Sequence, residues 1–203
     1  MPTVCTGITV VTAKTRYVFG ENFDKEKLSV HLNYSDGSFN TIKGSSCSVI
    51  GFSSANLGKN TVTITYDEYS TKLDLEIVVD DISILDINAY EKNNADIVSN
   101  AYDCYGVYYD KCYEMDVNTF GDTYLTYRLA GHFNKFTGTL ATVKTSRTAI
   151  FNVYADDKLI YSNTQINDIT GAVTFEINVT GCNFLKIVVD NNDLLLANAY
   201  FKK

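Results

Sequence analysis

The chain has no tryptophan, one proline and two histidines among its 203 residues. Without tryptophan, any ring that stacks on a ligand must come from tyrosine or phenylalanine. The two histidines, His31 and His132, leave little material for histidine-based catalysis or a histidine-rich metal site. Basic residues are also in the minority, with 17 Lys and Arg against 24 Asp and Glu and a net charge of −7. Because phosphate backbones are attracted by a basic surface, we expect no nucleic-acid partner.

Long apolar runs and the common catalytic motifs are missing as well. No apolar run reaches the ~18 residues that a membrane-spanning helix needs, so we expect no membrane insertion. The GxSxG, P-loop, HExxH and GxGxxG patterns do not occur. We therefore expect these residues to be non-catalytic and to need no organic cofactor. A catalytic domain elsewhere in a longer parent protein is compatible with this expectation.

The five cysteines show no CxxC spacing, which argues against a zinc ribbon or a thioredoxin-like site. Because their number is odd, at least one thiol is unpaired in any intramolecular scheme. Cys104 and Cys112 are the best candidates for a disulfide, since they would close a short loop. The alternative is five free thiols that pack as small hydrophobic groups.

Apolar and polar residues alternate along much of the chain. The alternation is clear at residues 28–34 (LSVHLNY), 61–66 (TVTITY) and 73–77 (LDLEI), and it returns near the C-terminus. A period of two is typical of half-buried strands, and Thr, Val, Ile and Tyr suit a pleated surface. Polar pairs such as Asp36-Gly37 and Asp156-Asp157 predict tight turns between strands. The sequence therefore predicts an all-β protein made of short antiparallel strands.

A domain boundary is predicted near residues 79–81 (VDD). One strand pattern ends immediately before this point and another begins at residue 82. We therefore predict two domains, 1–79 and 80–203. The first has four of the 15 tyrosines, so the second is expected to carry most of the aromatic surface that could hold a ligand.

The first domain resembles the group 3 bacterial immunoglobulin-like domain. The resemblance rests on residues 17–21 (YVFGE) and 34–38 (YSDGS), and continues through 58–66 (GKNTVTITY) and 73–79 (LDLEIVV). It implies a small immunoglobulin-like β-sandwich of about seven short strands. Domains of this family usually act as spacers in exported bacterial proteins.

The second domain resembles the NPCBM family of carbohydrate-binding modules. Residues 127–141 (YRLAGHFNKFTGTLA) and 151–161 (FNVYADDKLIY) carry its main signatures, and 175–181 and 185–189 match its last paired strands. Residues 103–109 (DCYGVYY) resemble an opening motif seen in variants. The resemblance implies a galactose-binding-like β-sandwich, a jelly roll, with a glycan or cell-surface polysaccharide as partner.

Two features of the family's sugar-binding members have no counterpart in this sequence. Those members carry a histidine-containing loop before the Tyr-x-Leu strand, where residues 118–123 read NTFGDT. They also carry a tryptophan near the final strand, where residues 196–201 read LANAYF. Both departures concern the sugar site and not the fold.

Residues 102–113 hold five tyrosines with acidic residues between them. Sugars present C–H faces that stack on aromatic rings, and their hydroxyls bind polar side chains. The segment would be a sugar platform on a loop, whereas on strands alternate tyrosines would belong to the core and to the sheet surface. The candidate carbohydrate-binding residues are Tyr105, Tyr108, Tyr109, Tyr113, Asp103 and Arg128. For Arg128, a surface cation paired with an aspartate is the alternative interpretation.

Calcium is a further candidate ligand. Residues 190–193 (DNND) offer hard oxygen ligands, with Asp190 and Asp193 as the candidate carboxylates for a structural ion. Turn formation alone also explains Asp and Asn at these positions.

The sequence as a whole predicts a non-catalytic segment of an exported bacterial protein, located outside the cell or on its surface. No secretory signal is visible at residues 1–7. The first domain would be a spacer and the second a module that binds cell-surface or host glycans. The alternative is a pair of structural stalk or interaction modules in a large surface protein, without a sugar site. The missing His and Trp favour this alternative, and the tyrosine cluster favours binding.

Overall fold

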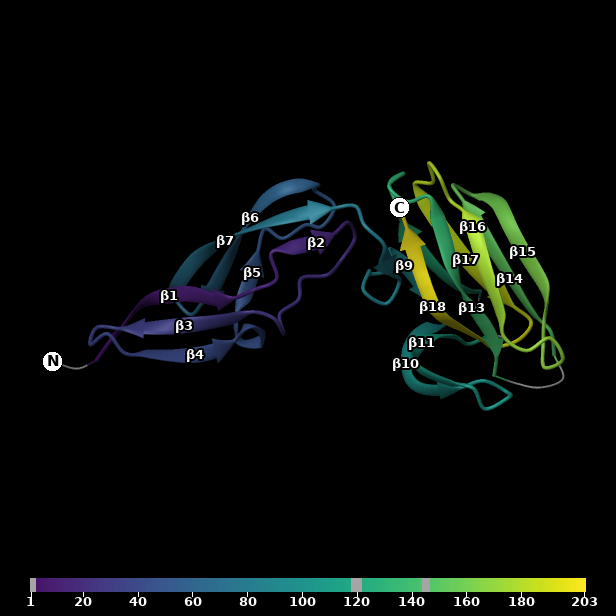
Figure 1. Ribbon diagram of the computed structural model, residues 1–203, viewed down its shortest axis with the longest axis horizontal. Coiled ribbons are helices and arrows are strands. Elements are labelled where there is room, and N and C mark those ends of the chain that lie inside the picture. The colour runs from purple at the N-terminus through teal and green to yellow at the C-terminus, as the bar shows by residue number, and fades with distance from the viewer. Residues whose placement is uncertain (1–2, 118–121, 144–146) are drawn as a thin grey trace. The chain divides into compact units, whose positions relative to one another are not determined.

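The computed structural model describes residues 3–117, 122–143 and 147–203. The chain divides into two compact units, Met1–Val79 and Asp80–Lys203. In Figure 1 the first unit runs from purple to blue and the second from teal to yellow. Both are built from strands, so the prediction of an all-β protein is confirmed. No helix within the described ranges has the length and apolarity needed to cross a membrane.

The first unit consists of two small sheets. A three-stranded sheet has the order β1-β3-β4 and a four-stranded sheet has the order β2-β7-β6-β5. Its elements are β1 (Cys5–Thr12), β2 (Arg16–Val18), β3 (Ser29–Tyr34), β4 (Phe39–Lys43), the 3₁₀ helix η1 (Gly44–Ser46), β5 (Ser48–Ile50), β6 (Gly58–Tyr66) and β7 (Tyr69–Val78). The predicted turn at Asp36-Gly37 joins β3 to β4, and Gly37 has φ +82°, which a residue without a Cβ adopts easily.

The core of the first unit lies between its sheets. Ile8 and Val30 come from the three-stranded sheet and Val62, Ile64 and Ile77 from the four-stranded one, and all five belong to one buried cluster. They are the inward members of the alternating runs, because successive side chains of a strand point to opposite faces. The period-two pattern therefore produces a sandwich whose interior is mostly aliphatic.

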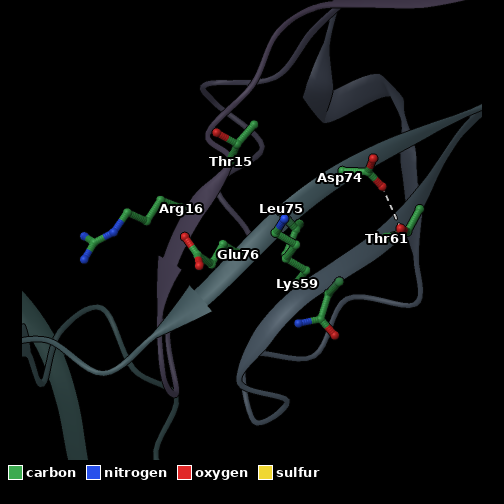
Figure 2. A pocket seen from close by; sticks show the side chains of 8 residues that line it. Thr15, Arg16, Lys59, Thr61, Asp74, Leu75 and Glu76 are labelled. Atoms are coloured by element: carbon green, nitrogen blue, oxygen red, sulfur yellow. Dashed lines mark hydrogen bonds between the residues drawn. The ribbon is translucent and has the colours of Figure 1, made fainter.

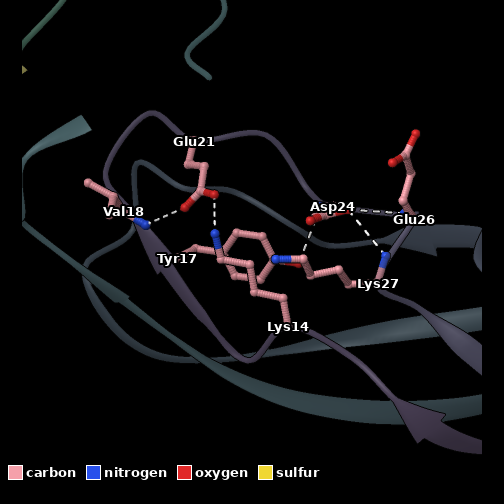
Figure 3. Close-up of polar contacts among 7 residues, drawn as sticks. All are labelled: Lys14, Tyr17, Val18, Glu21, Asp24, Glu26 and Lys27. Atoms are coloured by element: carbon pink, nitrogen blue, oxygen red, sulfur yellow. Dashed lines mark hydrogen bonds and ion pairs between the residues drawn. The ribbon is translucent and has the colours of Figure 1, made fainter. Parts of the chain in front are cut away.

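A polar network fixes the start of the four-stranded sheet around the buried Tyr17 (Figure 3). One Glu21 carboxylate oxygen forms an ion pair with Lys14, and the other accepts the Val18 N–H at 2.8 Å. The Lys14 ammonium also lies 5.0 Å from the centre of the Tyr17 ring. Burial raises the pKa of Tyr17 to about 12, and its hydroxyl oxygen accepts the Asp24 N–H at 3.3 Å. These contacts hold β2 in its parallel pairing with β7.

The second unit has a six-stranded and a five-stranded sheet. The first contains the path β10-β11-β18-β13-β16, with β8 paired to β18, and the second has the order β15-β14-β17-β12-β9. The strands are β8 (Ile82–Ser83), β9 (Glu91–Asn93), β10 (Ala95–Tyr102), β11 (Tyr108–Met115), β12 (Thr123–Arg128), β13 (Lys135–Thr142), β14 (Ala149–Ala155), β15 (Lys158–Ile166), β16 (Val173–Asn178), β17 (Phe184–Asp190) and β18 (Leu194–Lys202).

Aromatic rings join the two sheets of the second unit. Tyr127 on β12 meets Phe201 on β18 at 5.3 Å between ring centres, and Phe151 on β14 meets Phe175 on β16 at the same 5.3 Å. Each pair has one ring from each sheet, so the sheets pack face to face as a sandwich. Gly138 leaves room for this layer, because a Cβ built there would lie 2.8 Å from the Phe175 ring.

The candidate disulfide between Cys104 and Cys112 is not formed, because both residues are free cysteines. Cys112 is buried, and burial raises the pKa of its thiol to about 11. Cys104 instead places its sulfur 3.4 Å from the Thr142 hydroxyl. All five cysteines are free, which agrees with the alternative of thiols that pack as small hydrophobic groups.

Candidate functional site

The tyrosine-rich segment forms most of the hairpin made by β10 and β11. The two strands pair antiparallel, with Tyr102 directly opposite Tyr108, and residues 103–107 form the turn. The segment is therefore partly loop and partly strand. The alternatives left open by the sequence, a ring platform or alternate packing, apply to different tyrosines of the same hairpin.

Asp103 holds the turn together from a nearly buried position. One carboxylate oxygen accepts the N–H groups of Tyr105 and Val107, each at 2.9 Å. The other accepts the Tyr109 hydroxyl at 3.3 Å. With 7% of its surface exposed and these partners in place, Asp103 acts as a turn anchor.

Tyr109 and Tyr113 lie in the interior, with 8% and 4% of their surfaces exposed. Tyr109 packs in a small cluster with Cys112, Ala141 and Leu195 under the hairpin. Burial, followed by the nearby Asp103 charge, raises the pKa of Tyr109 to about 12. Neither ring offers a face to a ligand, so these two candidates belong to the packing.

Tyr102 and Tyr108 form an exposed ring pair next to the turn of the hairpin. Their ring centres are 5.4 Å apart with a 57° angle between the planes. Tyr102 is 58% exposed and Tyr108 is 48% exposed. The Tyr108 hydroxyl donates to Asn100 Oδ1 at 2.8 Å and lies 3.3 Å from Asp110 Oδ1. This surface combines two rings with an amide and a carboxylate.

Tyr105 extends the exposed surface towards the turn between β15 and β16. Its hydroxyl donates to the backbone oxygen of Asp168, and a Cβ built on Gly171 would lie 3.6 Å from its ring. The ring is 59% exposed, so one of its faces remains open to solvent. This hydrogen bond limits the motion of the side chain as a whole, which lowers the entropy cost of using the ring in binding.

Arg128 is not part of this surface. It is the last residue of β12, in the five-stranded sheet, whereas the hairpin belongs to the six-stranded sheet. Its register partner on β17 is Phe184. Arg128 was a candidate because a guanidinium can bind sugar hydroxyls, but the strand order places it in the other sheet of the domain.

Of the candidate calcium residues, Asp190 is the last residue of β17 and Asp193 lies in the turn before β18. Asp193 is nearly buried and accepts the Val117 N–H at 3.0 Å. The side-chain amides of Asn191 and Asn192 donate to the backbone oxygens of Thr148 and Arg147. Asp190 is exposed. No group of three or more His, Cys, Asp or Glu side chains suited to a metal ion occurs in the part of the chain that the structure describes.

The loop that replaces the family's histidine-containing segment lies mostly outside the described residues, because these omit 118–121. Of that loop, Asp122 is described, and its backbone oxygen accepts the Asn93 side-chain amide at 2.7 Å.

The first unit carries a polar hollow of about 540 Å³ on its four-stranded sheet (Figure 2). Arg16, Glu76 and Lys59 alternate in charge across three neighbouring strands, with Glu76 the register partner of both cations. Beside them, Thr61 donates to Asp74 at 2.6 Å. The described residues that line the hollow include no aromatic ring. It lacks the stacking surface found on the second unit, and we assign no ligand to it.

Two domain families match the sequence, in the predicted order. Residues 10–77 match the bacterial Ig-like domain (group 3), and residues 104–196 match the NPCBM/NEW2 domain. Both resemblances inferred from the sequence are therefore confirmed. A search of curated proteins gave no match.

Solved structures with a similar fold contain CBM51 modules. The CBM51-2 and INT domains of Clostridium perfringens ZmpB are 15% identical, with a TM-score of 0.50 over 96% of this chain and 48% of that one. The same domains with GlcNAc bound are 13% identical, with a TM-score of 0.50 over 97% and 48%. The tandem CBM51 modules of a Streptococcus pneumoniae family 98 glycoside hydrolase are 14% identical, with a TM-score of 0.50 over 68% and 54%. The chain thus spans about half the length of these structures, and the likeness shows the β-sandwich fold.

Proposed function

We propose that the second unit is a non-catalytic carbohydrate-binding module that holds a glycan on the ring pair of Tyr102 and Tyr108. The observation that carries this proposal is the exposed pair itself, with ring centres 5.4 Å apart, in a domain that matches the NPCBM/NEW2 family. The CBM51 fold supports it, since one such structure contains GlcNAc.

The chemistry of the surface suits a neutral sugar. A pyranose has an apolar C–H face that stacks on a phenol ring, and hydroxyls at its edge that need acceptors and donors. Asn100 and Asp110 place side-chain oxygens next to the Tyr108 hydroxyl, where they can accept from sugar hydroxyls. Tyr105 supplies a third, fixed ring on the same hairpin. Of the six candidates from the sequence, we retain Tyr105 and Tyr108 as ligand contacts and Asp103 as their positioning residue.

For the first unit we propose the role of a spacer that carries the binding module within a longer exported bacterial protein, outside the cell or on its surface. The match to a bacterial immunoglobulin-like domain supports this role. The structural alternative, in which both units are stalk modules without a sugar site, is favoured by the absence of tryptophan from the chain.

A glycan array followed by calorimetry on the full 203-residue chain tests the proposal. Galactosides and N-acetylglucosamine are the first probes for calorimetry. We expect Tyr102→Ala and Tyr108→Ala each to weaken glycan binding about fivefold, because each removes one stacking face worth about 1 kcal/mol. Tyr200→Ala is the matched control, since Tyr200 is 42% exposed on β18 and should change affinity less than about twofold.

Two results would contradict the proposal. Unchanged affinity in both Tyr102→Ala and Tyr108→Ala would show that the ring pair does not contact the glycan. No binding to any glycan on the array and in calorimetry would favour the structural alternative.

A further inference from the structure

A second aromatic hollow lies on the five-stranded sheet of the second unit. Its volume is about 410 Å³, and its lining includes Tyr90, Thr126, Phe184 and Lys186. Ligand pockets in proteins usually start at about 300 Å³, so this hollow has room for a small ligand. The residues come from β12 and β17 and from the chain leading into β9, so neither strand of the tyrosine hairpin contributes to it.

The hollow has an aromatic side that is open to solvent. The rings of Tyr90 and Phe184 meet edge to face, 5.3 Å apart with a 62° angle between their planes. Tyr90 is 61% exposed and Phe184 is 39% exposed. Exposed rings that already contact each other lose little further freedom when a ligand stacks on them.

Hydrogen bonds from the backbone N–H groups hold the chain at both aromatic residues. The Tyr90 N–H donates to the Thr126 backbone oxygen at 2.7 Å. The Phe184 N–H donates to the Asp156 carboxylate at 2.9 Å, and the same carboxylate accepts the Asn183 N–H at 3.2 Å. Asp156 therefore ties the β14–β15 turn to the start of β17. The backbone around the hollow is therefore held by bonds within the domain.

Polar groups of both signs surround the rings. Glu91 and Asp157 supply carboxylates and Lys186 supplies an ammonium, which lies 4.4 Å from the centre of the Tyr124 ring. A strongly charged ligand would meet repulsion from one sign or the other. A neutral ligand with many hydroxyls can donate to the carboxylates and accept from the ammonium at the same time.

We propose that this hollow is a second carbohydrate-binding site of the domain, which takes one neutral pyranose residue against Tyr90 and Phe184. The choice of ligand class rests on the proposed function of the domain, but the site uses a different sheet and none of the hairpin residues. Two sites on one module would let neighbouring sugars of a cell-surface polysaccharide be held together, and their combined affinity would exceed that of either site.

Site-resolved NMR of the ¹⁵N-labelled full chain tests this proposal. Methyl galactoside and N-acetylglucosamine are the probes, titrated separately to high millimolar concentration. With at least one probe we expect saturable shifts at the backbone amides of Tyr90, Thr126, Phe184 and Lys186. Tyr90→Ala should weaken the affinity measured from the shifts at the hollow about tenfold. It should leave the shifts at the Tyr102 and Tyr108 amides unchanged.

A second variant and a control separate binding from folding. Asp157 has a positive φ of 67°, which asparagine also tolerates, so Asp157→Asn should fold. The change removes one negative charge from the hollow and should weaken the affinity measured from the shifts there several-fold. Tyr200→Ala, on the other sheet, should leave the shifts at the hollow unchanged.

The two proposals fail in distinguishable ways. Shifts at the hairpin amides without shifts at the hollow overturn the second site and leave the first proposal, binding at the ring pair, standing. Shifts at the hollow alone support the second site and overturn the proposal that the ring pair binds a sugar. If neither region responds to either probe, the second site is overturned together with the assignment of a sugar ligand.

Discussion

Tyr102 and Tyr108 at the tip of the β10–β11 hairpin are about half exposed, whereas Tyr109 and Tyr113 further along β11 are buried. The four residues share one short segment, so composition does not separate them. What separates them is the neighbouring residues: Tyr109 packs in a buried cluster with Ala141 and Leu195, and Tyr113 lies beside Leu196 of β18 in the same sheet. The small residues Ala141 and Ala197 leave room for the buried Tyr109 ring. The rings of Tyr102 and Tyr108 face solvent. A tyrosine cluster is thus a possible binding surface only where its rings are not covered by neighbouring side chains.

The sharpest test of this comparison is the stability cost of removing a ring from each side. Tyr113→Ala should lower the free energy of unfolding by about 3–5 kcal/mol, because it leaves a cavity in a buried site. Tyr108→Ala should change it by no more than about 0.5 kcal/mol, since solvent replaces the ring. Denaturant unfolding followed by circular dichroism gives both values. Equal losses in the two variants would refute the division into buried and exposed rings.

The next largest effect is expected at the turn that separates the two groups. Asp103→Ala removes the acceptor for the N–H groups of Tyr105 and Val107 and for the Tyr109 hydroxyl. We expect a loss of about 1–3 kcal/mol, the range for polar groups left without partners in a protected site. Asp103→Asn retains one acceptor oxygen and should lose less.

Asp110→Ala is the matched control for Asp103, because Asp110 is an exposed carboxylate on the same hairpin. It should stay within about 0.5 kcal/mol of the parent chain. If Asp103→Ala is as mild as Asp110→Ala, the turn does not depend on its carboxylate and some other contact must position Tyr105.

The strands and turns could be predicted from the sequence, because hydrophobic alternation and turn-forming residues are local features of the chain. Asp36-Gly37 and Asp156-Asp157 both lie between paired strands as predicted, and the family signatures supply the order of the two folds. The inward residues of both cores follow from the same alternation.

The candidate site was only partly predictable, because it depends on long-range pairing. Alternation puts Tyr108 and Tyr109 on opposite faces of β11, but only the packing of the hairpin with β18 and β13 decides which face is buried. Arg128 was a candidate because of its hydrogen-bonding chemistry, but the strand order places it beside Phe184 in the other sheet. The Tyr90–Phe184 hollow was not predicted, since its two rings are far apart in the sequence and meet only through the pairing of β12 with β9 and β17.

The smallest expected effect concerns the hydroxyl of Tyr109, and it depends on pH. Burial raises the pKa of Tyr109 from 10.0 to about 12 in the folded protein, so the folded state holds this proton more tightly than the unfolded chain. Its stabilising contribution is complete below pH 10 and is lost as the pH rises towards 12. Tyr109→Phe should cost about 1 kcal/mol or less at neutral pH, the net value of one hydrogen bond, and should lose stability less steeply above pH 10. Unfolding curves for both proteins across that range measure the difference, and parallel pH profiles would show that Tyr109 ionises as freely in the folded chain as in the unfolded one.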